Sequence, residues 1–195
     1  MSEFDFDRAA EAIRDGELIV YPTETVYGLG ADALDADAVE GVFAAKDRDH
    51  SKPVSMAVPD VETAAEYTTP TERERAFMRE FLPGPVTVVL ERTPAVPDIL
   101  TAGRDRVGIR IPDHDGALEL LGRTGPLTAT SANVSGTGSV RDLATLDDRI
   151  RERAAVVLDG GTTPGGGSTV VDVAAGEIHR RGSAADAIEQ WLSDN

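Results

Sequence analysis

The sequence predicts an α/β fold in which one twisted mixed β-sheet is flanked by helices. Helical and strand-like hydrophobic patterns alternate along the chain, which is typical of this class. Several of the expected strands are joined by short turns, and this favours one large sheet. A chain of 195 residues buries about 70% of the surface that its unfolded form exposes, so we expect a single domain over residues 1–195.

The N-terminal part of the chain begins with a helix, a strand and a second helix. Residues 5–15 have helical spacing, and a glycine ends this helix. The apolar run over 17–22 predicts a strand that its proline stops. A polar loop then leads to an amphipathic helix over 35–46, with Asp35 or Asp37 as its N-cap.

The middle of the chain adds three strands and two helices. Short apolar runs predict strands over 54–58, 86–91 and 107–112. Helical spacing covers 71–82, where a Pro-Gly-Pro sequence ends the helix. A further helix is expected over 114–122, before the next strand.

The C-terminal part contains four expected strands and a final helix. The strands cover 126–130, 154–161, 168–173 and 176–182. The helix covers 184–193. A serine and an aspartate at its start have the spacing of a capping box, with aspartate in place of the usual glutamate.

The surface is expected to be rich in carboxylates. The chain has 35 acidic against 19 basic residues, which gives a formal net charge of −16. Such a surface repels itself unless salt screens it, so the composition predicts a halophilic protein. The same charge predicts that non-specific tRNA binding is weak or absent, because that binding depends on lysine and arginine.

Composition also excludes several kinds of site. The chain has no cysteine, so disulfides, thiolate metal sites and cysteine nucleophiles are excluded. No apolar run approaches the roughly 18 residues that span a bilayer. The acidic N-terminus lacks the apolar core of a secretory signal, so we expect a cytoplasmic protein. The three histidines have no zinc-site spacing, and we expect no protein-bound metal.

The first candidate site is the loop at 21–33, which follows a strand. Thr23, Glu24 and Thr25 offer two hydroxyls and a carboxylate at a strand end, where ligands bind in open sheets. The alternative is a turn in which the threonines pack and glycine provides positive φ. The residues alone favour neither interpretation.

The second candidate is the segment at 44–54, which contains both lysines of the chain, Lys46 and Lys52. Lys46 and Arg48 together suit a polyphosphate, since lysine is a compact charge and arginine a planar fork. The alternative is that these cations interact with the helix C-terminus or pair with Asp47 and Asp49.

The third candidate is the run at 128–136. Ser131, Asn133 and Ser135 alternate with apolar residues, so on an extended segment they would face one way and could recognise sugar, phosphate or an amino acid. The alternative is a turn centred on asparagine.

A glycine-rich segment and two strand arginines complete the set of candidates. The segment at 159–172 lacks the lysine of a P-loop and precedes a strand, so we expect a loop with Ser168 as its one directed group. Arg110 and Arg180 lie on expected strands, where an inward arginine needs an anionic partner. Each could instead lie on a surface face.

Six of these stretches occur together in the order found in the YrdC-like family, and they cover roughly residues 17–182. They read YPTETVYGLGADA, KDR followed by KPVSMAV, PGPVTVVL, VGIRIPDH, TSANVSG and GGSTVVD. The chain resembles this family, whose best-known members are threonylcarbamoyladenylate synthases. The resemblance implies a large concave cavity. It also implies that L-threonine, bicarbonate or CO2, and ATP are converted to threonylcarbamoyladenylate and pyrophosphate, an adenylyl transfer.

The resemblance also implies roles for particular residues. Those expected to act in catalysis, on the ATP phosphates and the carbamate, are Lys46, Arg48, Ser131 and Asn133. Those expected to bind threonine are Thr23, Arg110 and Ser168. Those expected to bind the nucleotide are Lys46, Ser131, Asn133, Arg141 and Arg180. Mg²⁺ is expected to arrive with the nucleotide. A separate tRNA transferase is expected to use the product.

The chain departs from the family pattern at two places. Asp49 and Arg181 stand where prolines are usual, which affects loop geometry and the nucleotide side more than the reaction. We expect no accessory C-terminal domain. Two alternatives remain open, namely a family paralogue with a different or lost activity and an RNA-binding module that uses the concave face.

Overall fold

The computed structural model describes residues 4–195 and contains every predicted helix and strand within a few residues of its expected ends. The strands are β1 Leu18–Tyr21, β2 Gly28–Gly30, β3 Ser55–Ala57, β4 Val86–Glu91, β5 Arg106–Arg110, β6 Leu127–Ser131, β7 Ala154–Val157, β8 Thr169–Asp172 and β9 Glu177–Arg180. The helices are α1 Phe6–Arg14, α2 Ala36–Lys46, α3 Val61–Tyr67, α4 Glu72–Phe81, α5 Asp98–Thr101, α6 Asp115–Thr124, α7 Asp148–Arg153 and α8 Ala185–Asp194, with a 3₁₀ turn at Leu143–Thr145.

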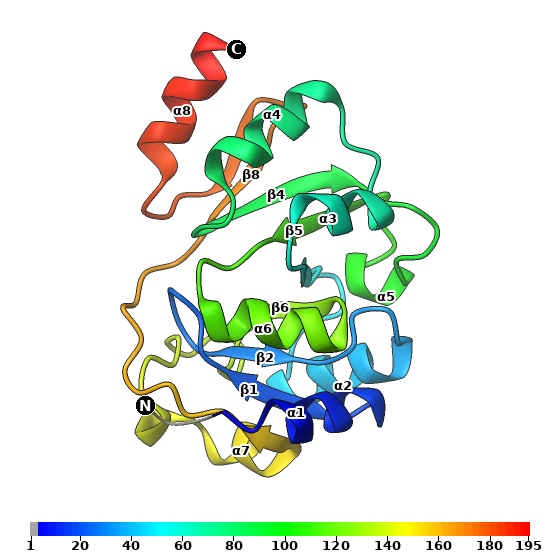
Figure 1. Cartoon of the computed structure of the whole chain (residues 1–195), viewed down its shortest axis with the longest axis vertical. Coiled ribbons are helices and arrows are strands. Elements are labelled where there is room, and N and C mark those ends of the chain that lie inside the picture. The colour runs from blue at the N-terminus through cyan, green and yellow to red at the C-terminus, as the bar shows by residue number, and fades with distance from the viewer. Residues whose placement is uncertain (1–3) are drawn as a thin grey trace.

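Within residues 4–195 the nine strands form one sheet in the order β7-β1-β2-β6-β3-β5-β4-β8-β9. Parallel pairs such as β3 with β5 occur beside antiparallel pairs such as β4 with β5, so the sheet is mixed. Helices α1 and α6 lie over the β1, β2 and β6 part, and α3 and α4 lie beside β4 and β5 (Figure 1). The predicted fold class is confirmed.

Strand β2 was not predicted, because its sequence is Gly-Leu-Gly and glycine disfavours strands. It pairs with β1 on one side and β6 on the other. A Cβ atom at Gly28 or Gly30 would lie 3.0 Å from the ring of Tyr21. The glycines therefore make room for a buried aromatic side chain, and the sheet itself supplies the hydrogen bonds that hold the strand. The short helices α3, α5 and α7 were also not predicted, although Asp60 caps α3 and Asp147 caps α7.

Side chains cap several helices, and one of the two predicted caps is confirmed. Asp35 caps α2, where it accepts hydrogen bonds from two backbone N–H groups. Thr71 and Glu74 form a capping box at the start of α4. The capping box predicted for α8 from Ser183 and Asp186 is wrong, because Ala184 is the N-cap and makes no side-chain bond. The Asp186 carboxylate instead pairs with Arg181, 2.7 Å away.

The β1 end of the sheet is covered by helices on both faces. Ile19 and Tyr21 pack in the cluster that contains α1 and α6. Leu18 and Val20, which alternate with them, pack in the cluster that contains α2 and α7. This two-sided burial follows from the period of two along a strand.

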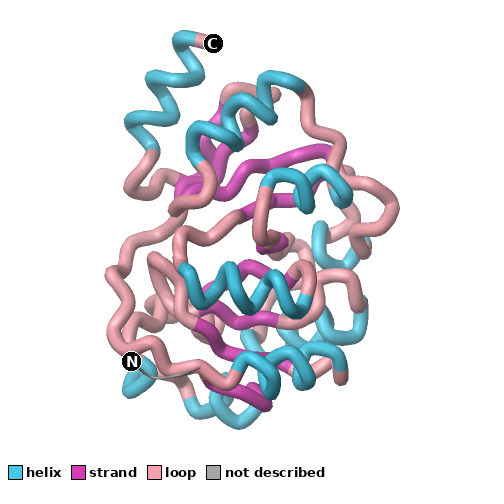
Figure 2. Tube along the Cα trace, viewed as in Figure 1, coloured by secondary structure: helices cyan, strands magenta, loops and turns pink. Residues whose placement is uncertain are grey.

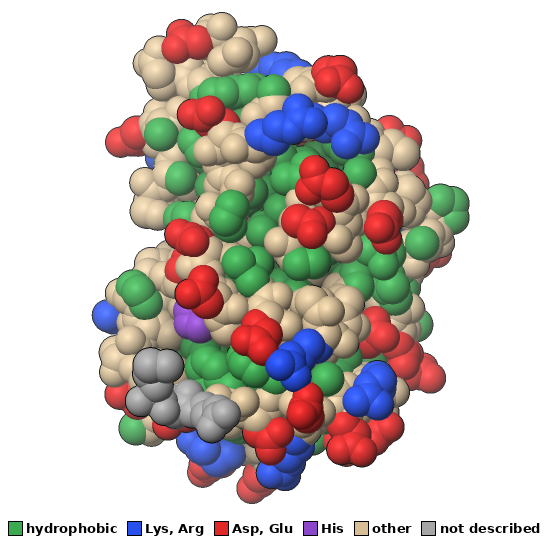
Figure 3. Space-filling model, in the orientation of Figure 1, with side chains coloured by type: hydrophobic (Ala, Val, Ile, Leu, Met, Phe, Trp, Pro, Cys, Tyr) green, Lys and Arg blue, Asp and Glu red, His purple; other side chains and the backbone are tan. Residues whose placement is uncertain are grey.

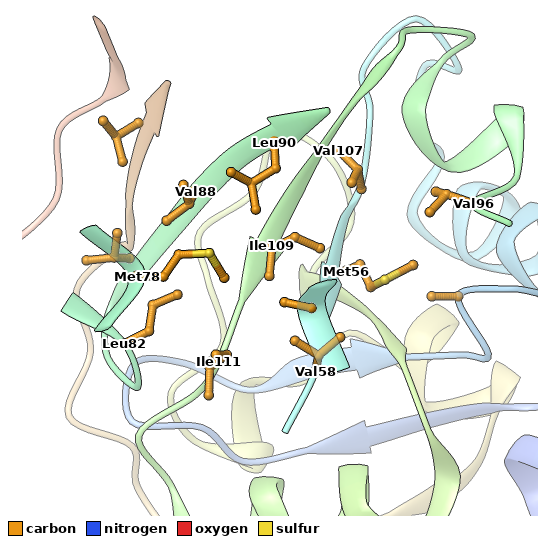
Figure 4. Packing of buried hydrophobic residues seen from close by; sticks show 14 of the residues in the cluster. Met56, Val58, Met78, Leu82, Val88, Leu90, Val96, Val107, Ile109 and Ile111 are labelled. Atoms are coloured by element: carbon orange, nitrogen blue, oxygen red, sulfur yellow. The ribbon is translucent and has the colours of Figure 1, made fainter. Parts of the chain in front are cut away.

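The β4 and β5 part of the sheet has one face in the core and one face open to a cavity. Val88 and Leu90 of β4 and Ile109 of β5 lie on the core face, where Met78 of α4 packs against them (Figure 4). Residues on the opposite face, such as Thr87 and Val89, line the cavity instead. Helices thus cover this part of the sheet on one face only.

The loop from β7 to β8 connects two strands that lie near opposite edges of the sheet. It follows one side of the molecule as a long irregular segment (Figure 2). Hydrogen bonds fasten it to the β1–β2 loop, including those from Tyr27 Oη to the Gly161 carbonyl (2.6 Å), from the Gly160 N–H to Tyr27 Oη (3.0 Å) and from the Gly165 N–H to the Thr25 carbonyl (2.7 Å). The glycine-rich segment is therefore an anchored connection that reaches the cavity.

Acidic side chains are spread widely over the face seen in Figure 3. None of the helices between residues 4 and 195 is both long and apolar enough to cross a membrane.

Candidate active site

A cavity of about 860 Å³ lies on the open face of β4 and β5 and extends to the ends of β1 and β6. Five of the 17 arginines of this acidic chain line it. They are Arg48, Arg104, Arg106, Arg110 and Arg180. Asp105 and Asp172 are the carboxylates among the described lining residues. The cavity thus gathers positive charge within a chain of net charge −16.

Three of these arginines interact electrostatically. Burial and the charge of Arg180 lower the pKa of Arg48. Burial and the charge of Arg110 lower the pKa of Arg180. Groups that repel one another in this way gain stability when an anion binds between them. The arrangement therefore suits a ligand with more than one negative charge.

The β1–β2 loop holds Arg110 at one side of the cavity. Arg110 Nη2 donates to Glu24 Oε1 (2.8 Å) and to Thr25 Oγ1 (2.7 Å). Thr23 Oγ1 donates to the Val26 carbonyl (2.7 Å) and accepts from the Thr25 N–H (3.2 Å). Thr23 and Arg110, both predicted to bind threonine, thus lie together in the cavity wall.

Ser168 and Arg180 form a second polar group in the same wall. Arg180 donates through Nη2 to Ser168 Oγ (2.6 Å) and through Nε to the Ser168 carbonyl (2.9 Å). Ser168 ends the glycine-rich loop, and Arg180 ends β9, so pairing of β8 with β9 brings them together. Both residues line the cavity.

Lys46 lies behind the cavity wall, where its side chain is 2% exposed. Its Nζ donates to the Asn133 carbonyl (2.6 Å) and to the Ser131 carbonyl. Burial, with a smaller contribution from Arg48, lowers the pKa of Lys46 to about 8. Lys46 therefore links the end of α2 to the end of β6 and the residues that follow it. Of the two residues whose carbonyls it contacts, Ser131 lines the cavity and Asn133 does not.

The expectation that Ser131, Asn133 and Ser135 face one way is wrong. Strand β6 ends at Ser131, so the alternation stops there. Asn133 is 8% exposed, and its Nδ2 donates to the Val134 and Thr137 carbonyls. Ser131 Oγ donates to Asn133 Oδ1, whereas Ser135 is exposed. The asparagine-centred turn describes this segment better, and Asn133 in this turn holds the Ser131 hydroxyl at the cavity wall.

Arg48 reaches the cavity although aspartate follows it. Its guanidinium donates to the Lys52 and Pro53 carbonyls at 3.1 and 2.8 Å. Asp49 accepts from the Ser51 N–H (2.8 Å) and is exposed, so its carboxylate forms a local turn rather than an ion pair with Arg48. Lys52 is exposed and lies outside the cavity lining.

Arg141 also lies outside the lining residues. Its Nε donates to the Thr163 carbonyl (3.2 Å), which helps to hold the glycine-rich loop. Its predicted contact with the nucleotide stays a prediction. Between residues 4 and 195 there is no group of three or more histidine or acidic side chains arranged to hold a metal ion.

Sequence reasoning missed an ion-pair cluster at the other end of the cavity. Arg106 Nη2 lies 3.1 Å from Asp172 Oδ1 and 3.6 Å from Glu74 Oε1. The signal was present in β5, where Arg106, Gly108 and Arg110 alternate with two apolar residues and so share one face.

Gly108 keeps the floor of the cavity open. A Cβ atom there would lie 2.6 Å from Ser55 Oγ and 2.9 Å from Thr87 Cγ2. We expect Gly108→Ala to reduce the free energy of unfolding by about 1–3 kcal/mol, because neither neighbour can withdraw freely. Urea denaturation at fixed KCl measures this. Gly122→Ala is the control, since nothing lies within 4 Å of a Cβ at that helical position. Equal stability of the two variants would contradict the prediction.

A family model for Sua5, YciO and YrdC proteins, described as telomere recombination, matches residues 11–182. The chain belongs to the Sua5/YciO/YrdC family. A threonylcarbamoyl-AMP synthase of Pyrococcus abyssi is 37% identical to it over 176 residues, which are 89% of this chain and 52% of the relative. The chain spans about half the length of the curated relatives from P. abyssi and Bacillus subtilis.

Solved structures of the family have the same fold. The structure of P. abyssi Sua5 complexed with L-threonine aligns with a TM-score of 0.89 and 36% identity, and covers 95% of this chain and 56% of the other. The structure of Escherichia coli YciO aligns with a TM-score of 0.82 and 26% identity, and covers 91% of this chain and 89% of the other. The family resemblance read from the six motifs is confirmed.

Proposed function

We propose that this chain is a threonylcarbamoyladenylate synthase, which forms threonylcarbamoyladenylate and pyrophosphate from L-threonine, bicarbonate or CO2, and ATP. One observation carries the proposal. Arg48, Arg110 and Arg180 converge on one cavity whose wall also presents the hydroxyls of Thr23, Ser131 and Ser168. The relatives named threonylcarbamoyl-AMP synthase and the family structure with L-threonine support the choice of substrate.

The reaction requires positioning more than reactive side chains. Threonine and CO2 first combine into a carbamate. A carbamate oxygen then attacks the α-phosphorus of ATP, the bond from that phosphorus to the bridging oxygen breaks, and pyrophosphate leaves. Two anions must be brought together in line, which an arginine-lined cavity can do. No covalent protein nucleophile is needed, because the carbamate itself attacks the phosphorus. Burial raises the pKa of Tyr21, which lines the cavity, to about 12, so this phenol stays neutral.

In this proposal some residues of the cavity wall bind threonine and others bind the nucleotide. Arg110 binds the threonine carboxylate, and Thr23 and Ser168 complete that side. Arg48 and Arg180 bind the phosphates, and Lys46 and Asn133 act through Ser131, whose carbonyl and hydroxyl they contact. Arg141 is assigned to the nucleotide side through the glycine-rich loop.

Mg²⁺ is proposed to enter with the nucleotide. The carboxylates lining the described cavity are Asp105 and Asp172, and Asp172 already pairs with Arg106. This donor set fits a metal carried by phosphates rather than a protein cage. We further propose that the enzyme is a cytoplasmic nucleotidyltransferase and that a separate transferase moves the product onto tRNA. The acidic composition favours a halophilic source and weak direct tRNA binding.

A family paralogue with another activity is the second candidate. Arg181 replaces the usual proline, but it pairs with Asp186 and Glu189 outside the cavity lining, so this departure does not alter the residues that line the site. The third candidate function is an RNA-binding module that uses the concave face. Binding of tRNA at micromolar affinity or better in physiological salt would support this third candidate.

The test is to incubate the pure protein with ATP, bicarbonate and L-threonine in high KCl and measure pyrophosphate and the adenylate. We expect pyrophosphate release that depends on threonine, and an adenylate of threonine carbamate in the mass spectrum. Reactions without threonine, and with serine in its place, are the controls. The absence of threonine-dependent pyrophosphate in protein shown to be folded would refute the proposal in favour of the paralogue.

A further inference from the structure

Glu24 has no role in the reaction as proposed. Its side chain is 15% exposed, it pairs with Arg110, and it is not among the residues that line the cavity. A carboxylate near an anion-binding cavity opposes the binding of anions by simple electrostatics. Any favourable effect of Glu24 on a ligand must therefore act through Arg110.

Glu24 and Thr25 together occupy one nitrogen of the Arg110 guanidinium. Nη2 donates to Glu24 Oε1 at 2.8 Å and to Thr25 Oγ1 at 2.7 Å. A guanidinium nitrogen of this type carries two hydrogens, so both are used. The donors of Nη1 are the ones that Arg110 can offer to a ligand in the cavity that it lines.

Two buried atoms of the same ion pair lack hydrogen-bond partners within the described residues. They are Glu24 Oε2 and Arg110 Nε. One is an acceptor and the other a donor, and a rotation of the carboxylate would pair them. Such a rotation would give a bidentate pair, the geometry in which carboxylate and guanidinium groups bind most strongly. Such a pair fixes the plane of the guanidinium.

The charge of Arg180 gives a reason for Glu24 to restrain the Arg110 guanidinium. Arg110 and Arg180 are close enough for the charge of one to lower the pKa of the other. Repulsion of this kind favours conformations in which the two guanidinium groups lie further apart, and a carboxylate partner opposes that separation. Glu24 is placed to supply that carboxylate.

We propose that Glu24 is a positioning residue that orients the Arg110 guanidinium so that Nη1 receives the carboxylate of the amino-acid substrate. The inference rests on the proposed function, because it takes L-threonine as the substrate. Glu24 itself neither contacts the substrate nor transfers a proton.

The test measures binding of L-threonine and, separately, of ATP by calorimetry. Glu24→Gln is expected to weaken threonine binding about tenfold and to leave ATP binding unchanged, because partners that orient a binding group contribute about 10- to 100-fold in affinity. In turnover assays the loss should appear in KM for threonine rather than in kcat. Glu80→Gln, an exposed glutamate on α4, is the matched control and should change nothing. Wild-type threonine affinity in Glu24→Gln would overturn the proposal.

A double-mutant cycle separates positioning from a general effect on the fold. In an Arg110→Gln background, Glu24→Gln should have little further effect on threonine affinity, and an undiminished effect would overturn the proposal. If Glu24→Gln does not fold, threonine binding is measured in Glu24→Asp, which keeps the charge but has a side chain shorter by one methylene. Wild-type threonine affinity in Glu24→Asp would also overturn the proposal. A wild-type protein that binds threonine without releasing pyrophosphate refutes the proposed function, and the binding experiment still decides the role of Glu24.

Discussion

Arg110→Ala is expected to weaken threonine binding by about 100-fold or more, because truncating one partner of a buried charge pair costs about 2–5 kcal/mol. The loss has two parts. The substrate carboxylate loses its cation, and Glu24 is left as a buried carboxylate whose Arg110 partner is gone. Calorimetry with L-threonine, with KM for threonine as a second measure, checks the expected result.

Two further variants show whether the effect belongs to this position. Arg110→Lys restores the charge without the planar fork, so only part of the affinity should return. Arg79→Ala removes an exposed arginine on α4 and should leave threonine binding unchanged. Near-normal affinity in Arg110→Ala would contradict the assignment of the carboxylate to this residue.

Lys46→Met is expected to reduce turnover by about 10- to 100-fold, because a residue that orients a binding group contributes about this much. Methionine keeps the buried stem but not the ammonium that holds the Ser131 and Asn133 carbonyls. Leaving buried carbonyls without that donor should also lower the free energy of unfolding by about 1–3 kcal/mol each. Lys52→Met, which removes the one other lysine of the chain, is the matched control and should keep activity and stability.

The pH dependence of stability provides an independent check on Lys46. Its pKa is about 8 in the folded protein, against 10.5 for an ordinary lysine. Between these values the unfolded chain binds the proton and the folded chain does not, so stability rises with pH in that window. Lys46→Met should lack this rise. Activity should change in the opposite direction, because the ammonium is lost above about pH 8. Identical pH profiles of stability for both proteins would contradict the burial of a charged Lys46.

The fold was predictable wherever a segment carries its own pattern. Asp35 caps α2 as its position in the sequence predicts, and the apolar periods place β1, β4 and β5. Strand β2 was missed because Gly28 and Gly30 have no strand preference. Its pairing depends on Tyr21, whose ring occupies the space that side chains at those glycines would take. A strand formed by its neighbours leaves no local signal.

The candidate site was predictable as a set of residues but not as an arrangement. Thr23, Arg110 and Ser168 do line the cavity, as does Arg48. Lys46 and Asn133 instead lie behind Ser131 and support it. Spacing along the chain shows that two polar groups can meet. It does not show which of them reaches the cavity surface, because that depends on where β6 ends.

The α/β class, most of the helices and strands, and membership of the family can be read from the sequence, because each follows from local periods and ordered motifs. Which charged groups face one another depends on the folded arrangement of the chain. Residues 24 and 110 are far apart in the chain, and their ion pair exists because β1 and β5 belong to one sheet. Burial then makes that pair strong, since charges removed from water interact in a lower dielectric.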